Sequence, residues 1–312
     1  VNRNDPLNFL KDKEVHMKKV EPREKTMAGV ILADTKRGIA QAVCEVFDHF
    51  GGGGKLLRSS RDVYIKVNGV GSEPYVYTDP EVLRETILYF RRCGARKIFV
   101  MENCTQANFT RLVFQSTGYL RICKETGAVP VYLDETLSVP VFLEGIEEFI
   151  DISAFVFERL MEQSDENFYL SLPKLKTHSM SQVTLSIKNQ FGLVHQRSRI
   201  ADHNYRLHQK FADIYRLLRP DFALIDGLIA TNHGHYPTTY NAGECIVPMN
   251  LLIGGPDPLA TDVVGAALMG FSLAEVKHLD FCRATGIGQS DMEQINIINR
   301  PLFDERKQNF TC

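Results

Sequence analysis

Short apolar runs alternate along most of the chain with longer segments of helical period. From residue 28 on, the β-branched run AGVILAD indicates a strand, and GIAQAVCEVFDHF, which follows it, indicates a helix. The segment DPEVLRETILYFRRCG predicts a second helix, with Asp79 as its N-cap and Pro80 in its first turn. Strand, helix and strand follow one another repeatedly. This order predicts an α/β fold with a mostly parallel sheet and helices on both faces.

The same alternation continues through the second half of the chain. We expect a strand at FYLSLPKLK, a helix over about residues 180–190, a helix at YRLHQKFADIYRLL, strands at DFALIDGL and VPMNLLIGG, and a helix at DPLATDVVGAALMG. The irregular stretch 134–167 is typical of a junction between lobes. We therefore predict a mobile tail over residues 1–26 and two lobes around a cleft, an N-terminal α/β lobe over 27–150 and a C-terminal α/β lobe over 151–312 that carries most of the site.

Basic side chains gather in the segment SLPKLKTHSMSQVTLSIKNQFGLV. If its first part is extended, alternation places Lys174, Lys176 and His178 on one side of the strand. Lys188 and Asn189 would follow on the next helix. A basic strand end that leads into a helix N-terminus is a sound anion site, because free N–H groups and the helix dipole add to the side-chain charge. A solvated lysine patch beside a buried Asn189 is the alternative.

Polar residues also stand at the ends of apolar strands. YIKVNGV presents Lys66 and Asn68 on one face, at the carboxyl end where open α/β sheets bind ligands, although a half-exposed edge strand would read the same way. Asp226 ends the apolar run ALIDGL, and such a charge costs free energy unless it is paired or used. Asp257 fits a site residue and equally an N-cap before Pro258.

Two histidines, His233 and His235, follow Asp226 on a glycine-containing loop. Imidazole suits proton transfer near neutral pH and also metal binding, so these two side chains and Asp257 are candidate ligands of a divalent metal. Solvated loop histidines are the alternative. The sequence does not identify a cofactor.

The composition excludes several classes of partner. The formal net charge of the 312 residues is -2, which gives no reason to bind nucleic acid or an anionic membrane surface. The seven cysteines show no C-x-x-C spacing, so we expect reduced thiols and no iron–sulfur cluster within the chain. No apolar run reaches membrane-spanning length, and no nucleotide, serine-hydrolase or zincin motif is present. A soluble, cytoplasmic protein with a small anionic ligand is the expectation.

Six blocks follow one another along the chain: YIKVNGV, TDPEVLRETILYFRRCGARKIFV, TGYLRICKETGAVPVYLDE, PKLKTHSMSQVTLSIKNQFGLV, RPDFALIDGLIA and GGPDPLATDVVGAALMGF. They occur in the order that defines the family called domain of unknown function 362, which the chain resembles over roughly residues 28–271. Members of that family often carry a ferredoxin-like module with two [4Fe–4S] clusters, and this chain has no closely spaced cysteine set to hold one.

A more distant likeness is to lactate racemase and its relatives. There a His is followed at similar spacing by a Lys that anchors a nickel pincer nucleotide, and His178 and Lys188 are spaced like that pair. The glycines typical of the racemase block are replaced here by SQVTLSIKN.

These observations predict an enzyme that acts on a small carboxylate or phosphate by proton transfer, as an isomerase or racemase does, with or without a metal. The alternatives are an iron–sulfur-associated oxidoreductase that works with a separate redox partner, and a non-catalytic anion-binding module. A homo-oligomer is compatible with each. The predicted catalytic residues are His178, Lys188 and Asp226, and the predicted substrate-binding residues are Lys66, Asn68, Lys174, Lys176 and Asn189.

Overall fold

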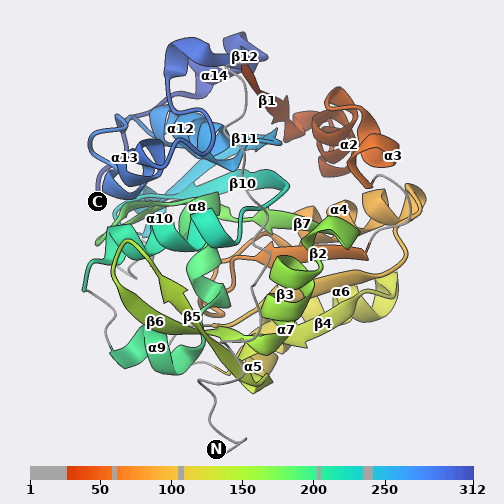
Figure 1. Ribbon diagram of the computed structural model, residues 1–312. Helices are drawn as coiled ribbons and strands as arrows, with labels where there is room; N and C mark the ends of the chain where they lie inside the picture. Colours follow the sequence, from red (N-terminus) through yellow and green to blue (C-terminus); the bar gives the residue numbers. More distant parts are fainter. Residues whose placement is uncertain (1–26, 58–61, 105–108, 202–204, 235–241) are drawn as a thin grey trace, which may run out of the picture.

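One ten-stranded sheet runs through the molecule, with eight strands in the order β12-β1-β11-β10-β7-β2-β3-β4 (Figure 1). The other two strands lie off this path, with β8 paired to β10 and β9 paired to β8. The computed structural model describes residues 27–57, 62–104, 109–201, 205–234 and 242–312. The strands are β1 (Ala28–Asp34), β2 (Asp62–Val67), β3 (Ile98–Glu102), β4 (Val129–Tyr132), β7 (Asn167–Leu172), β8 (Lys174–His178), β9 (Gln182–Thr184), β10 (Phe222–Thr231), β11 (Ile246–Gly255) and β12 (Ile295–Ile298).

Most neighbouring strands in this sheet are parallel. β2 is parallel to both β3 and β7, and β10 is parallel to both β7 and β8. β11 runs antiparallel to its neighbours β1 and β10, and β9 runs antiparallel to β8. The predicted α/β fold with a mostly parallel sheet is confirmed.

Helices cover both faces of the sheet, as predicted. One face packs against α2 (Ile39–His49), α3 (Gly52–Leu57), α4 (Pro80–Arg92), α5 (Thr110–Ser116) and α6 (Tyr119–Thr126). The other packs against α8 (Ser186–Asn189), α10 (Leu207–Leu217), α12 (Pro258–Leu268), α13 (Lys277–Ala284) and α14 (Arg300–Arg306). The shorter helical segments are α7 (Ala154–Val156), α9 (Gln196–Ala201), α11 (Ala242–Cys245), η1 (Thr35–Arg37), η2 (Leu133–Glu135), η3 (Phe157–Glu162), η4 (Ser164–Glu166), η5 (Gln190–Leu193) and η6 (Met292–Gln294).

Strand β2 carries a lysine into the interior. Val63, Ile65 and Val67 belong to the apolar cluster under α2 and α4, whereas Tyr64 belongs to the cluster on the opposite face. Because side chains alternate along a strand, Lys66 falls on the same face as Tyr64. That face is the one covered by α8.

The helix expected over residues 180–190 is wrong in its extent. The chain turns back after β8 and forms β9, which pairs antiparallel with β8 through Lys176 with Thr184 and His178 with Gln182. Gln182 has a φ of 60°, which a helix does not allow. Strand pairing therefore takes the residues before 185, and the helix that remains, α8, has four residues.

The stretch 134–167 contains a hairpin of β5 (Ser138–Leu143) and β6 (Glu148–Ser153), which forms a separate two-stranded sheet beside α9 and α10 (Figure 1). Strands from before and after residue 150 interleave in the large sheet, since β1 lies between β12 and β11. The division into lobes at residue 150 stays a prediction, and residues 1–26 lie outside the described residues. In the described part of the chain, no helix is long and apolar enough to cross a membrane.

Candidate functional site

Four lysines, which we call the lysine group, lie close enough for the charges of three of them to shift the pKa of the fourth, Lys176: Lys66, Lys174, Lys176 and Lys188. The exposed fractions of the first three are 1%, 2% and 0%, and Lys188 is partly buried. Lysines are almost never fully buried unless they are paired or used. Burial lowers the pKa of Lys176 well below its ordinary value, and the positive charges of the other three lysines lower it further. The group therefore shares one electrostatic environment.

Lys66 forms a buried ion pair with Glu102. Its Nζ lies 2.5 Å from Oε1 of Glu102 and donates to the carbonyl of Val67 at 2.7 Å. Glu102 in turn accepts from the backbone N–H of Gly69 at 2.6 Å and of Asn103 at 2.8 Å. Burial lowers the pKa of Lys66, and the Glu102 carboxylate opposes that shift. The pair thus holds a charge inside the protein at the carboxyl ends of β2 and β3.

Asn189 on α8 connects the helix to the sheet. Its Nδ2 donates to the carbonyl of Lys66 at 3.0 Å and to Oγ of Ser171 at 3.3 Å. Its Oδ1 accepts from Nδ2 of Asn68 at 3.2 Å and from Nζ of Lys66 at 3.4 Å. Three predicted binding residues, Lys66, Asn68 and Asn189, are therefore in direct contact.

Asp226 pairs with Lys174 and also holds the start of α4. Its Oδ2 lies 2.9 Å from Nζ of Lys174 and accepts from the N–H of Asp79, the N-cap of α4, at 2.7 Å. Its Oδ1 accepts from the N–H of Leu228 at 3.0 Å. The pairing expected of a charge that ends an apolar strand is thus present, and it ties β10, β8 and α4 together.

The amine of Lys188 has a pKa close to neutrality. Burial, and then the positive charges of Arg199 and Lys66, lower the pKa of its amine to about 7, while Glu102 opposes them. The amine lies 5.8 Å from the ring centroid of Phe211. At neutral pH a large share of Lys188 is therefore unprotonated, and a neutral amine can accept a proton.

Two charged residues near the group were missed by the sequence analysis. Arg199 is 7% exposed, and its Nη2 donates to Oδ1 of Asn103 at 2.8 Å and to the carbonyl of Cys104 at 2.6 Å. Its Nε is buried with no hydrogen-bond partner among the described residues. Nothing in QRSRIA marks Arg199 as buried, whereas Glu102 ends the apolar run KIFVME as Asp226 ends its own strand. The burial of Glu102 could therefore have been predicted from the sequence.

His178 lies at the far end of β8 from the ion pairs. The residue is 8% exposed, and its Nδ1 accepts from the N–H of Met180 at 3.2 Å. The side chains that shift the pKa of Lys188 most are Arg199, Lys66 and Glu102. A role of His178 in proton transfer stays a prediction.

The candidate metal ligands have other contacts. Asp257 is the N-cap of α12, and its carboxylate accepts from the N–H groups of Leu259, Ala260 and Gln289. The ring of exposed His233 contacts the hydroxyl of Thr311 at 2.8 Å, and His235 lies outside the described residues. Across the ranges that the structure describes, no three His, Cys, Asp or Glu side chains form a group that could hold a metal ion.

A buried histidine beside the lysine group makes the fold sensitive to acid. His278 is fully buried and stacks on His208 with ring centroids 5.9 Å apart, and neither of its ring nitrogens has a partner in the described part of the molecule. Burial, and then the charges of His208 and Lys188, hold the pKa of His278 well below its ordinary 6.5. The unfolded chain therefore binds a proton that the folded chain does not. The stability contributed by neutral His278 is present above pH 6.5 and is lost as the pH falls below it.

We expect the free energy of unfolding to fall more steeply below pH 6.5 in the wild type than in His278→Leu. The difference in slope is about 1.4 kcal/mol per pH unit for one proton. Urea unfolding at pH 7, 6 and 5 measures it. Parallel slopes for the two proteins would show that His278 is protonated in the folded state.

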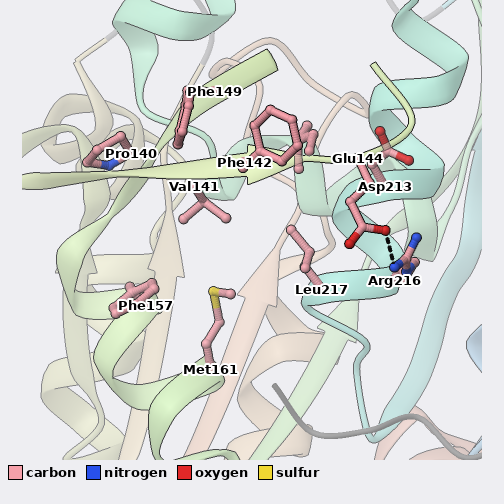
Figure 2. A pocket seen from close by; sticks show the side chains of 11 residues that line it. Pro140, Val141, Phe142, Glu144, Phe149, Phe157, Met161, Asp213, Arg216 and Leu217 are labelled. Carbon is pink, nitrogen blue, oxygen red and sulfur yellow. Dashed lines mark hydrogen bonds and ion pairs between the residues drawn. The ribbon is translucent and has the colours of Figure 1, made fainter. Parts of the chain in front are cut away.

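A pocket of about 270 Å³ lies between the β5–β6 hairpin, η3 and α10 (Figure 2). Its lining is mostly apolar, including Val141, Met161 and Leu217, and the ion pair of Glu144 with Arg216 stands at its edge. None of its lining residues belongs to the lysine group. The lysine group, and not this pocket, is therefore the candidate site for an anion.

The model of a family described as a domain of unknown function, DUF362, matches residues 63–267. The chain belongs to this family. The resemblance predicted from the sequence is confirmed, and the matched segment contains all four lysines, Glu102 and Asp226. A curated protein similar to this DUF362 chain is the thylakoid-associated protein sll1697 of Synechocystis sp., which is 24% identical over 267 residues, covering 82% of this chain and 78% of that protein.

Two solved structures resemble this DUF362 protein. Lactate racemase apoprotein from Thermoanaerobacterium thermosaccharolyticum matches with a TM-score of 0.47 and 11% identity over 81% of this chain. A protein from Thermotoga maritima matches with a TM-score of 0.38 and 10% identity over 80% of this chain. The chain spans 58% and 59% of the lengths of these two structures.

Proposed function

We propose that this DUF362 protein is a cytoplasmic enzyme that moves a proton on a small carboxylate, with Lys188 as the base. The observation that carries the proposal is the position of the Lys188 amine near the buried cations Arg199 and Lys66, which together with burial lower its pKa to about 7. A base whose pKa lies near the working pH is the most effective in proton transfer. A non-catalytic anion-binding module would need the cations but would have no use for a neutral amine.

Arg199 and Lys176 are the groups that would hold the carboxylate. The buried Nε of Arg199 has no acceptor in the described residues, and a carboxylate oxygen would supply one. Lys176 uses its amine in one described hydrogen bond, to the carbonyl of Val76 at 2.6 Å. Its pKa is lowered by burial and by neighbouring cations, so an anion that binds nearby favours its protonated form. Binding would therefore be accompanied by proton uptake.

The proposed chemistry is removal of a proton from the carbon next to the carboxylate. The neutral amine of Lys188 takes that proton, and the resulting negative charge on the substrate is stabilised by the surrounding positive charges of Lys66 and Arg199. Return of a proton to the same face of the carbon exchanges the hydrogen. Return to the opposite face, by a second proton donor or by solvent, isomerises the substrate.

Hydrogen exchange in D₂O tests this function on whole classes of candidate substrate. The wild-type protein is incubated with separate small 2-hydroxy acids, 2-amino acids and unsubstituted carboxylic acids, and loss of the proton next to the carboxylate is followed by NMR. We expect catalysed exchange with at least one of the three classes. Carboxylates that bind without any exchange would identify an anion-binding module instead, and stoichiometric iron with visible absorbance would favour the redox alternative.

A further inference from the structure

Asp262 is a buried carboxylate that contacts the helix carrying Lys188. It lies inside α12, is 0% exposed, and accepts from the backbone N–H of Ser186 at 2.8 Å and of Ile187 at 2.7 Å. These are the first two N–H groups of α8, and Lys188 is the next residue. No cationic side chain pairs with Asp262 among the residues that the structure describes.

This arrangement is costly for the fold. Burial raises the pKa of Asp262 to about 8, against the lowering effect of the two N–H groups. A buried acidic side chain without a cationic partner destabilises the folded state unless its hydrogen bonds compensate for the lost contact with water. The two hydrogen bonds of Asp262 go to the backbone of α8.

Helix α8 depends on contacts from outside itself. A helix of four residues has too few internal hydrogen bonds to be stable alone. Asp262 holds its first turn from α12, and Asn189 holds its last residue against Lys66 and Ser171 of the sheet. Lys188 lies between these two attachments, so its backbone is fixed on both sides.

We propose that Asp262 is a positioning residue that keeps Lys188 in its partly buried place among the charged groups of the site, an inference that rests on the proposed function of Lys188. Asp262 acts through the backbone of α8. The charged groups that face Lys188 are Arg199, Lys66 and Glu102, with Lys176 and His278 also within electrostatic range, and Asp262 is not among those that shift it. When α8 loosens, water reaches the amine and removes the main cause of its low pKa.

The test is the pH dependence of acetylation of Lys188 by acetic anhydride, read residue by residue by mass spectrometry. This measurement needs no substrate. The side chain in Asp262→Asn can accept only one of the two N–H groups, because its NH₂ is a donor. In this variant we expect the midpoint of Lys188 labelling to move up by about one pH unit or more, which is about a tenfold lower rate at pH 6.

Asp257→Asn is the matched control. Asp257 is a buried carboxylate at the start of the same helix, accepts from three backbone N–H groups, and makes no described hydrogen bond to α8. We expect this variant to be less stable but to keep the labelling midpoint of Lys188. An equal shift in both variants, or no shift in folded Asp262→Asn, would overturn the proposal.

Ser186→Pro tests the positioning role of Asp262 if Asp262→Asn does not fold. Proline is tolerated in the first turn of a helix, and here it removes one of the two N–H groups that Asp262 accepts. A smaller upward shift of the Lys188 midpoint is expected, and an unchanged midpoint would count against a positioning role. A labelling midpoint of Lys188 near pH 10.5 in the wild type, the ordinary pKa of lysine, would instead rule out Lys188 as the base. The two failures are thus distinguishable.

Discussion

Lys188→Met loses the catalysed hydrogen exchange by a factor of about 10² to 10⁴, the usual contribution of a positioned base, while the fold is retained. Methionine has a similar length and is compatible with the contact to Phe211. It cannot accept a proton from carbon. Exchange measured by NMR in D₂O, beside the circular dichroism spectrum and the unfolding midpoint, checks both parts of the expectation.

Lys188→Arg and Lys124→Met are the controls. Arginine is positively charged at any workable pH and cannot act as the base, so this variant should bind the carboxylate without exchanging its hydrogen. Lys124 is an exposed lysine on α6, and its loss should leave the exchange rate unchanged.

In the wild type the exchange rate should rise with pH and level off above about 7, where Lys188 is neutral. Full exchange in a folded Lys188→Met protein would rule out this base.

The sequence predicted that Lys66 and Asn68 share one face, because this inference rests on strand alternation. Lys66 and Asn68 lie on one face of an apolar run, and the structure places both against Asn189. Asp226 ends an apolar strand and is paired, as such a charge requires. These inferences needed only the period of a strand and the cost of a buried charge.

The sequence failed where distant residues decide the local structure. Residues 182–184 have a pattern that fits a helix, but their pairing with β8 makes them a strand. The first turn of α8 is held by Asp262, which is far away in the chain. Arg199 is buried because Asn103 and Cys104 offer it acceptors. Such contacts leave no local periodicity, so only the fold reveals them.

Loss of the buried Lys66–Glu102 ion pair should reduce stability much more than loss of an exposed ion pair. Lys66→Met leaves the Glu102 carboxylate buried without its cation, and breaking a buried ion pair from one side costs about 3–5 kcal/mol. Gly192 packs closely against this pair, since a Cβ at residue 192 would come within 2.5 Å of Oε1 of Glu102. The chain around Glu102 therefore has little room to rearrange when the cation is lost. Urea unfolding at pH 7 measures the loss.

The double variant Lys66→Met/Glu102→Gln shows whether the uncompensated charge is the cause. It removes both charges and keeps a side-chain oxygen that can accept from Gly69 or Asn103, so we expect it to recover much of the stability that Lys66→Met loses. Arg111→Met is the surface control. It breaks the exposed pair with Glu135, which should cost less than about 1 kcal/mol because water screens both charges. Equal losses in Lys66→Met and the double variant would mean that packing, and not the charge of Glu102, sets the stability here.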